Sequence, residues 1–280
     1  MSDRQYHNHI LATVSLVVAG ILMAWTAAAS ANDQYRTISV VDGGTLSGQV
    51  TLKGDTPPPR FFPVALYPFG PFCTKNAAIQ DEKGHFLLPE FRVGSGGGLK
   101  DVIVVIEGIT SGKPFKPIVA DVVAKGCEFF PFVNIVQDRG ALRIRNDDSV
   151  IHNSQLYQSE KGNVILNVPM PSNSDETYTI AFEKNRRVYQ MICGMHEYMQ
   201  TWGFAVDNPY YTRVDAQGRF AIDRIPPGRY TVTAWHPHMQ QIELEITVPA
   251  NGKAEIDFEF DANKVILPHY ETQEKFRVGP

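Results

Sequence analysis

The sequence predicts an all-β chain that folds into two β-sandwiches. Almost every periodic segment alternates apolar and polar residues with a period of two and is rich in Val, Ile, Tyr and Phe, which is typical of strands. Clusters of Gly, Pro and Asn separate these segments, and no amphipathic helical pattern is found. The clearest predicted strands are residues 45–53, 99–107, 132–137, 177–183, 187–192, 230–235, 242–248 and 254–260.

The chain begins with a segment that has the features of an export signal. The basic Arg4 precedes a mostly apolar run over residues 10–25, and residues 29–31 (Ala-Ser-Ala) fit the small-residue rule for a cleavage site. We therefore predict a signal peptide over residues 1–31 and a periplasmic, exported mature protein. Because residues 10–31 are nearly long enough to span a bilayer, an uncleaved N-terminal anchor is the alternative. Apart from such an anchor, we expect no membrane contact.

Composition narrows the class of partner. The formal net charge is −4, and 20% charged with 43% hydrophobic residues is ordinary for a globular protein. No basic stripe is found, so we exclude nucleic acid as a partner. The acids Asp147, Asp148 and Glu197 could recognise a basic partner such as a cytochrome, although exposed acids usually only solvate a loop.

The stretch over residues 56–98 is rich in proline and aromatic residues and contains Cys73. We expect it to form a loop that packs over a sandwich. A surface that docks a partner protein is the alternative function for it.

The segment Cys193–Met199 (CGMHEYM) places a thiolate, an imidazole and a thioether three residues apart. A copper ion that cycles between Cu(I) and Cu(II) prefers two imidazoles and a thiolate in a trigonal plane, with a weak axial thioether. Cys193, His196 and Met199 offer three of these four donors. His152, which follows the strand-like run 141–145, offers the second imidazole. The pattern therefore predicts a mononuclear copper site, although each of these residues taken singly is more often structural.

Residues 128–207 resemble the type 1 blue copper proteins, the cupredoxins. The order of the four donors and the C-x-x-H-x-x-M spacing are similar to those of the amicyanin and pseudoazurin branch, whose loop is shorter than that of plastocyanin. The resemblance implies a Greek-key β-sandwich that binds one copper. The implied ligands are His152, Cys193, His196 and Met199.

The resemblance also implies a role for each residue of the site. Asn153 is expected to tie the two ligand loops together by hydrogen bonds. We expect His152 to be buried and Met199 to tune the reduction potential. His196 is expected to expose a ring edge that passes electrons to a partner.

Three cysteines remain after removal of the signal, and an oxidising compartment favours the pairing of two of them. If Cys193 stays a thiolate to hold copper, the disulfide joins Cys73 to Cys127. Two free structural thiols are the alternative, because the sequence does not show whether these residues come within bridging distance.

Residues 211–233 resemble the carboxypeptidase regulatory-like, or Cna-B-type, module. The resemblance rests on a D-x-x-G-x-F turn over residues 215–220 and a P-P-G-x-Y motif over residues 226–230. The opening strands of this family have their counterparts far upstream, at residues 48–52 and 99–106.

We therefore expect a discontinuous prealbumin- or Ig-like sandwich made of residues 40–125 and 209–262, with the cupredoxin inserted between its two parts. Two sequential domains are the alternative. Residues 263–280 have no periodicity and are predicted to form an extended tail.

These observations favour an electron carrier over an enzyme. The mature sequence has one His-x-His pair, His236 and His238, which is too few for a multinuclear copper centre, and we expect it to form a polar turn. No motif of a nucleophile elbow, zinc protease or phosphate loop is found. The expected function is single-electron transfer between periplasmic partners such as a c-type cytochrome or a dehydrogenase. The alternatives are copper delivery and a structural or interaction module with a vestigial copper site.

Overall fold

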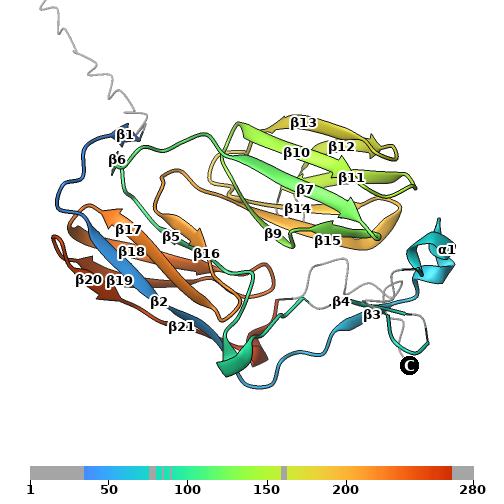
Figure 1. Cartoon of the computed structure of the whole chain (residues 1–280), viewed down its shortest axis with the longest axis horizontal. Helices are drawn as coiled ribbons and strands as arrows, with labels where there is room; N and C mark the ends of the chain where they lie inside the picture. The colour runs from blue at the N-terminus through green and yellow to red at the C-terminus, as the bar shows by residue number, and fades with distance from the viewer. Residues whose placement is uncertain (1–34, 76–79, 84, 89, 159–162, 267–280) are drawn as a thin grey trace, which may run out of the picture. The chain divides into compact units, whose positions relative to one another are not determined.

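The structure is a computed structural model that describes residues 35–75, 80–83, 85–88, 90–158 and 163–266. The predicted signal peptide and residues 267–280 of the predicted tail lie outside these ranges. Within them the chain is all-β, as predicted, and its helices are single turns (Figure 1). None of the described helices has the length and apolar character needed to cross a bilayer.

One pair of sheets forms a sandwich that we call sandwich A (Figure 1). Its first sheet has the order β16-β5-β18-β19, and in its second sheet β2 pairs with β17, β20 and β21. Apolar side chains from both sheets form one buried core, which includes Leu46 of β2, Val104 of β5 and Phe220 of β17. The strands are β2 (Gly44–Lys53), β5 (Ile103–Ile106), β16 (Tyr211–Arg213), β17 (Arg219–Ile225), β18 (Gly228–Trp235), β19 (Ile242–Val248), β20 (Lys253–Glu255) and β21 (Phe258–Asp261).

A second pair of sheets forms sandwich B. Its four-stranded sheet has the order β13-β10-β7-β8, and its five-stranded sheet has the order β12-β11-β14-β15-β9. Leu142 of β10 and Leu156 of β11 belong to the core between them. The strands are β7 (Val119–Lys125), β8 (Glu128–Phe130), β9 (Val133–Val136), β10 (Gly140–Asn146), β11 (His152–Gln158), β12 (Val164–Met170), β13 (Asp175–Ile180), β14 (Val188–Cys193) and β15 (His196–Ala205).

The strands of sandwich A come from two separate parts of the chain. β2 and β5 precede the strands of sandwich B, whereas β16 to β21 follow them, and the register pairs Gly48 with Phe220 and Val104 with Ala234. β7 pairs in parallel with β10. Although β7 falls within the expected range 40–125, it therefore lies in a sheet of sandwich B.

The expected strand over residues 254–260 is divided into β20 and β21, both of which run parallel to β2. Between them, the Ile256 amide donates a hydrogen bond to the Ser47 carbonyl. A Cβ atom on Gly48 would lie 1.8 Å from the Ile256 carbonyl oxygen. Gly48 thus allows the two backbones to approach closely at this break in the strand.

The long stretch after β2 packs against sandwich B in its first part, and against sandwich A in its last part, where Phe91 and Leu99 join the core of sandwich A. It contains the hairpin β3 (Arg60–Phe62) and β4 (Phe86–Leu88), the short helices η1 (Val64–Leu66) and α1 (Gly70–Cys73), and η3 (Ser95–Gly97). Val64 and Cys73 are buried in the core of sandwich B. We call residues 63–75 the capping segment. The remaining elements are β1 (Arg36–Thr37), which pairs with β6 (Ser111–Gly112), and η4 (Ala262–Lys264).

A third buried cluster joins the two sandwiches. It contains Ile103 and Trp235 of sandwich A together with Trp202 and Phe204 of β15. β15 therefore contributes to the interior of sandwich B at one end and packs against sandwich A at the other.

Gly203 is a point in β15 that leaves no room for a side chain. Its register partner is Tyr189, and a Cβ atom at this position would lie 2.0 Å from the Tyr189 ring. We expect Gly203→Ala to lower the free energy of unfolding by about 1–3 kcal/mol, because the fully buried ring must move. Chemical denaturation measures this difference. Val164→Ala, on an exposed position of β12, is the control and should be nearly neutral; equal stability of both variants would contradict the prediction.

Candidate metal centre

Three strand ends bring the donors of the site together. His152 begins β11, Cys193 ends β14 and His196 begins β15. β11 and β14 are antiparallel, so the start of one lies beside the end of the other, with Ser154 paired to Cys193. A register shift at Cys193 then pairs it with His196 across the tight turn into β15.

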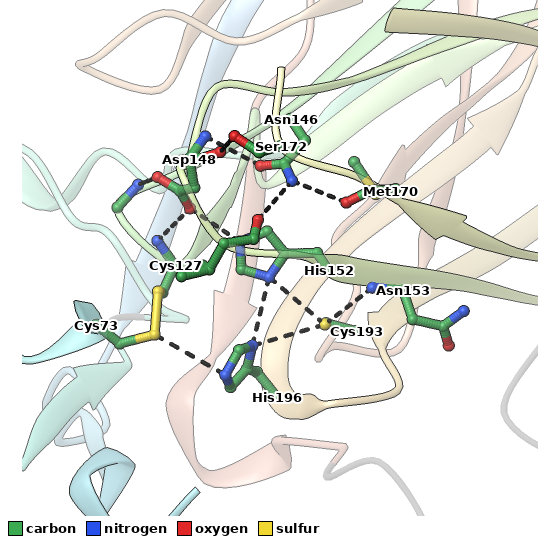
Figure 2. A network of polar contacts seen from close by, with 12 residues as sticks. Cys73, Cys127, Asn146, Asp148, His152, Asn153, Met170, Ser172, Cys193 and His196 are labelled. Atoms are coloured by element: carbon green, nitrogen blue, oxygen red, sulfur yellow. Dashed lines mark hydrogen bonds and ion pairs between the residues drawn. A yellow bond between two sulfur atoms is a disulfide. The ribbon is translucent and has the colours of Figure 1, made fainter. Parts of the chain in front are cut away.

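The donor atoms form a compact triangle, shown in Figure 2. The Cys193 Sγ atom lies 3.8 Å from Nδ1 of His152 and 3.8 Å from Nδ1 of His196, and the two Nδ1 atoms are 3.3 Å apart. The point equidistant from the three atoms lies about 2.1 Å from each, which is a bond length for nitrogen and thiolate ligands of a first-row metal ion. All three side chains are fully buried. The donor set fits a single copper ion bound to two imidazoles and a thiolate.

Met199 lies in the same buried core as Cys193 and is 1% exposed. It follows Tyr198 on β15, three residues beyond His196. Met199 is thus a buried residue of the core of sandwich B. Met199 also lines a cavity of about 60 Å³ together with Glu90, Glu128 and Gln200.

Asn153 connects the two loops that carry the donors. Its amide N–H points at the Cys193 sulfur at 3.4 Å, and its carbonyl accepts a hydrogen bond from the Gly194 amide at 2.9 Å. Its side-chain amide donates to the Val168 carbonyl on β12. These contacts fix the thiolate relative to β11.

In each imidazole, Nε2 is the outer nitrogen, the one that does not belong to the triangle, and an acceptor binds it. Nε2 of His152 lies 2.9 Å from the Asp148 carboxylate, and Nε2 of His196 lies 2.5 Å from the Pro68 carbonyl oxygen. A carbonyl only accepts, so Nε2 of His196 carries a proton, and Nδ1 is the nitrogen that would bind a metal ion in the triangle. Asp148 has the same effect on His152.

The prediction that His196 exposes a ring edge is wrong. The side chain is 0% exposed because the capping segment covers it. Besides the Pro68 carbonyl, the Phe69 ring contacts His196 edge-on with the ring centroids 6.5 Å apart, and Cys73 Sγ lies 3.9 Å from its Nε2.

A disulfide between Cys73 and Cys127 attaches the capping segment to sandwich B, and Cys193 is the free cysteine. Cys127 lies in the turn between β7 and β8, and its amide donates to Asp148 at 2.9 Å. Both cysteines of the disulfide therefore contact the site. The Cys73 sulfur contacts His196, and the Cys127 backbone contacts the Asp148 carboxylate that holds His152 (Figure 2).

The buried donors perturb one another's ionisation. Burial by itself raises the pKa of Cys193, but its contacts with the imidazoles of His152 and His196 outweigh it and lower the pKa to about 6. Burial by itself lowers the pKa of His152, whereas its contacts with Asp148 and Cys193 raise it to about 9. Asp148 is also buried, yet its hydrogen bonds from His152 and from the amides of Cys127 and Gly126 hold its pKa below the ordinary value. The site thus favours a thiolate even without a metal ion.

His236 and His238 lie in a turn after β18, as expected, which a hydrogen bond from the Met239 amide to the His236 carbonyl closes, and both side chains are fully buried. The imidazole rings stack on Phe91 and Phe132 respectively. Among the described residues, neither histidine belongs to a group of three or more His, Cys, Asp or Glu side chains close enough to hold a metal ion.

Sequence reasoning missed two partners of the site. Asp148 was expected to solvate a loop, but it is 5% exposed and binds His152. Its position four residues before His152 is the signal that could have suggested the contact. Pro68 acts through its backbone carbonyl, which leaves no mark in the sequence.

The lowered pKa of Cys193 is testable in metal-free protein. We expect the ultraviolet absorbance of the thiolate to appear with a midpoint at about pH 6 in the folded protein, compared with 9.0 for an ordinary thiol. Because the folded state favours the thiolate, the stability that it contributes is lost as the pH falls through about 6. Cys193→Ser should remove the step, since the disulfide cysteines do not titrate. A midpoint at 9.0 or above would show that the imidazoles do not stabilise the thiolate.

Comparison with known proteins gives one family match and several partial structural matches. Residues 205–261 match the family model of the carboxypeptidase regulatory-like domain. A search of curated proteins gives no match.

Several solved structures match part of this chain. A purple cupredoxin from Nitrosopumilus maritimus is 19% identical with a TM-score of 0.27, and the match covers 31% of this chain and 99% of that one. Amicyanin from Paracoccus versutus is 12% identical with a TM-score of 0.28, covering 37% and 97%. A Cu-containing nitrite reductase from Thermus scotoductus is 16% identical with a TM-score of 0.28, covering 34% of this chain and 24% of that one. These structure matches each cover about a third of this chain, and the match to the carboxypeptidase regulatory-like domain covers residues 205–261.

Proposed function

We propose that this chain is an exported type 1 copper protein that transfers single electrons between periplasmic redox partners. The observation that carries the proposal is the buried triangle of two Nδ1 atoms and one thiolate, whose common centre lies at metal-bond distance from all three. Copper, when bound there, supplies a one-electron Cu(I)/Cu(II) couple.

The proposed ligands are His152, Cys193, His196 and Met199, with Met199 as the weak axial donor. The protein contributes a thiolate at neutral pH and two imidazoles whose outer nitrogens are already bound. Because all of the donors are buried and held by neighbouring strands, they need to move little between oxidation states, and water is kept away from the metal. Such a site suits electron transfer without a substrate.

The covered His196 changes the proposed route for the electron. A partner such as a c-type cytochrome or a dehydrogenase cannot touch its ring directly. We infer that electrons pass through the capping segment, where the Pro68 carbonyl binds Nε2 and the Phe69 ring is 40% exposed at the surface. The sequence also favours a carrier over an enzyme, because one His-x-His pair is too few for a multinuclear centre.

We also propose that the chain is divided into a copper domain over residues 128–207 and a regulatory-like sandwich over residues 40–125 and 209–262 that positions it. The pairing of β2 and β5 with β16, β17 and β18 supports the interrupted arrangement. The parallel pairing of β7 (Val119–Lys125) with β10 favours a boundary before β7 rather than at residue 125.

The absorption spectrum of the copper-loaded mature protein tests the proposed function. We expect an intense visible thiolate-to-copper charge-transfer band, which Cys193→Ser abolishes because serine supplies no thiolate. Repeated oxidation and reduction should leave the metal bound. A colourless loaded protein, or colour retained in the serine variant, would refute the type 1 site. Release of copper on reduction would favour copper delivery, and failure to bind copper would favour a structural module.

The axial role of Met199 can be tested separately. We expect Met199→Leu to retain copper and the visible band, because three strong ligands remain, and to raise the reduction potential, because a thioether donor that stabilises Cu(II) is lost. Voltammetry and metal analysis measure the two effects. Loss of copper from this variant would show that Met199 is needed to hold the metal.

A further inference from the structure

Asp148 is a buried carboxylate in a site where a backbone carbonyl would be enough to hold the imidazole. It is 5% exposed, and one of its oxygens, Oδ2, lies 2.9 Å from Nε2 of His152. The amides of Gly126 and Cys127 donate to Oδ1 and Oδ2 at 2.6 and 2.9 Å. The carboxylate thus accepts from three N–H donors. Figure 2 shows Asp148 with Cys127 and His152 beside it.

The position of Asp148 is fixed from behind as well. Its amide donates to the Asn146 side chain at 3.0 Å, and its carbonyl accepts from Ser172 Oγ at 2.9 Å. The Asn146 amide group in turn donates to the carbonyls of Val150 and Met170 at 2.8 and 2.9 Å. Asn146 therefore folds the loop before β11 inward, so that both Asp148 and His152 are directed toward the site.

The two imidazoles have unequal outer partners. His196 donates to the neutral carbonyl of Pro68, whereas His152 faces a carboxylate. A carboxylate behind a ligand imidazole orients the ring and makes it a stronger donor. A fixed negative charge near a buried metal also favours the more positively charged oxidation state.

We propose that Asp148 is a positioning residue of the copper centre, which holds His152 with Nδ1 toward the metal and makes Cu(II) more stable relative to Cu(I). This inference rests on the proposed function, since it concerns the same site. It assigns to Asp148 an effect on the reduction potential that the Pro68 carbonyl does not exert through His196. The Gly126 and Cys127 amides keep the carboxylate in place.

Asp148→Asn tests the proposal, because it removes the charge and keeps the shape. The adjacent Asp147→Asn is the matched control, since Asp147 is exposed and pairs with Arg145 at the surface. We expect Asp148→Asn to shift the reduction potential upward and to weaken copper binding by about 10–100-fold in a competition with a chelator. Asp147→Asn should change neither. Equal potentials in wild type and Asp148→Asn, or equal shifts in both variants, would overturn the proposal.

A second measurement on the wild-type protein does not depend on the folding of a variant. In the Cu(I)-loaded protein, which is diamagnetic, NMR should detect a proton on Nε2 of His152 that exchanges slowly with water. A proton on Nε2 that exchanges at the rate of an exposed imidazole would contradict the proposal. If wild type lacks the visible band, the proposed function itself fails; if the band is present but the potential of Asp148→Asn is unshifted, only the role of Asp148 is wrong.

Discussion

The candidate site depends on the partners of its outer ring nitrogens. A buried polar atom without a hydrogen bond costs about 1–3 kcal/mol, so acceptors for the outer nitrogens stabilise the buried rings of His152 and His196. Asp148 and Pro68 occupy the outer nitrogens of His152 and His196. Nδ1 of each ring is thereby turned toward the Cys193 sulfur in the buried interior. A metal ion at the centre of the triangle would be bound by all three atoms.

Cys127 connects both outer partners. Its amide donates to Asp148, and its sulfur is bonded to Cys73 in the capping segment that also carries Pro68. The disulfide therefore holds the segment that carries Pro68, the acceptor for His196. The backbone amide of Cys127 holds Asp148, the acceptor for His152. Covering His196 is a consequence of the same connection, which is why the exposed ring edge implied by the resemblance is absent.

The sequence was sufficient for those parts of the site that are encoded locally. Strands were predictable because alternation reports one buried face, and the ligand spacing was predictable because Cys193 and His196 share one tight turn. The role of Asp148 was not predictable, because two adjacent acids are typical of an exposed loop. In the structure, the Asn146 side chain accepts from the Asp148 amide and turns the loop inward. Pro68 acts through a carbonyl that any residue carries, 128 positions away from His196. β7 was not among the predicted strands, although its buried and exposed residues alternate, and alternation does not indicate which sheet a strand joins.

β15 gives sandwich A a physical connection to the site without contact with the metal. The strand begins at His196, and its Trp202 and Phe204 side chains, each 2% exposed, pack against Ile103, Val105 and Trp235 of sandwich A. A strand held at both ends moves less than one that is free at one end, because close-packed interiors resist displacement. Since electron transfer is favoured by ligands that move little, a regulatory-like sandwich can assist the proposed electron carrier simply by stiffening the strand that bears His196.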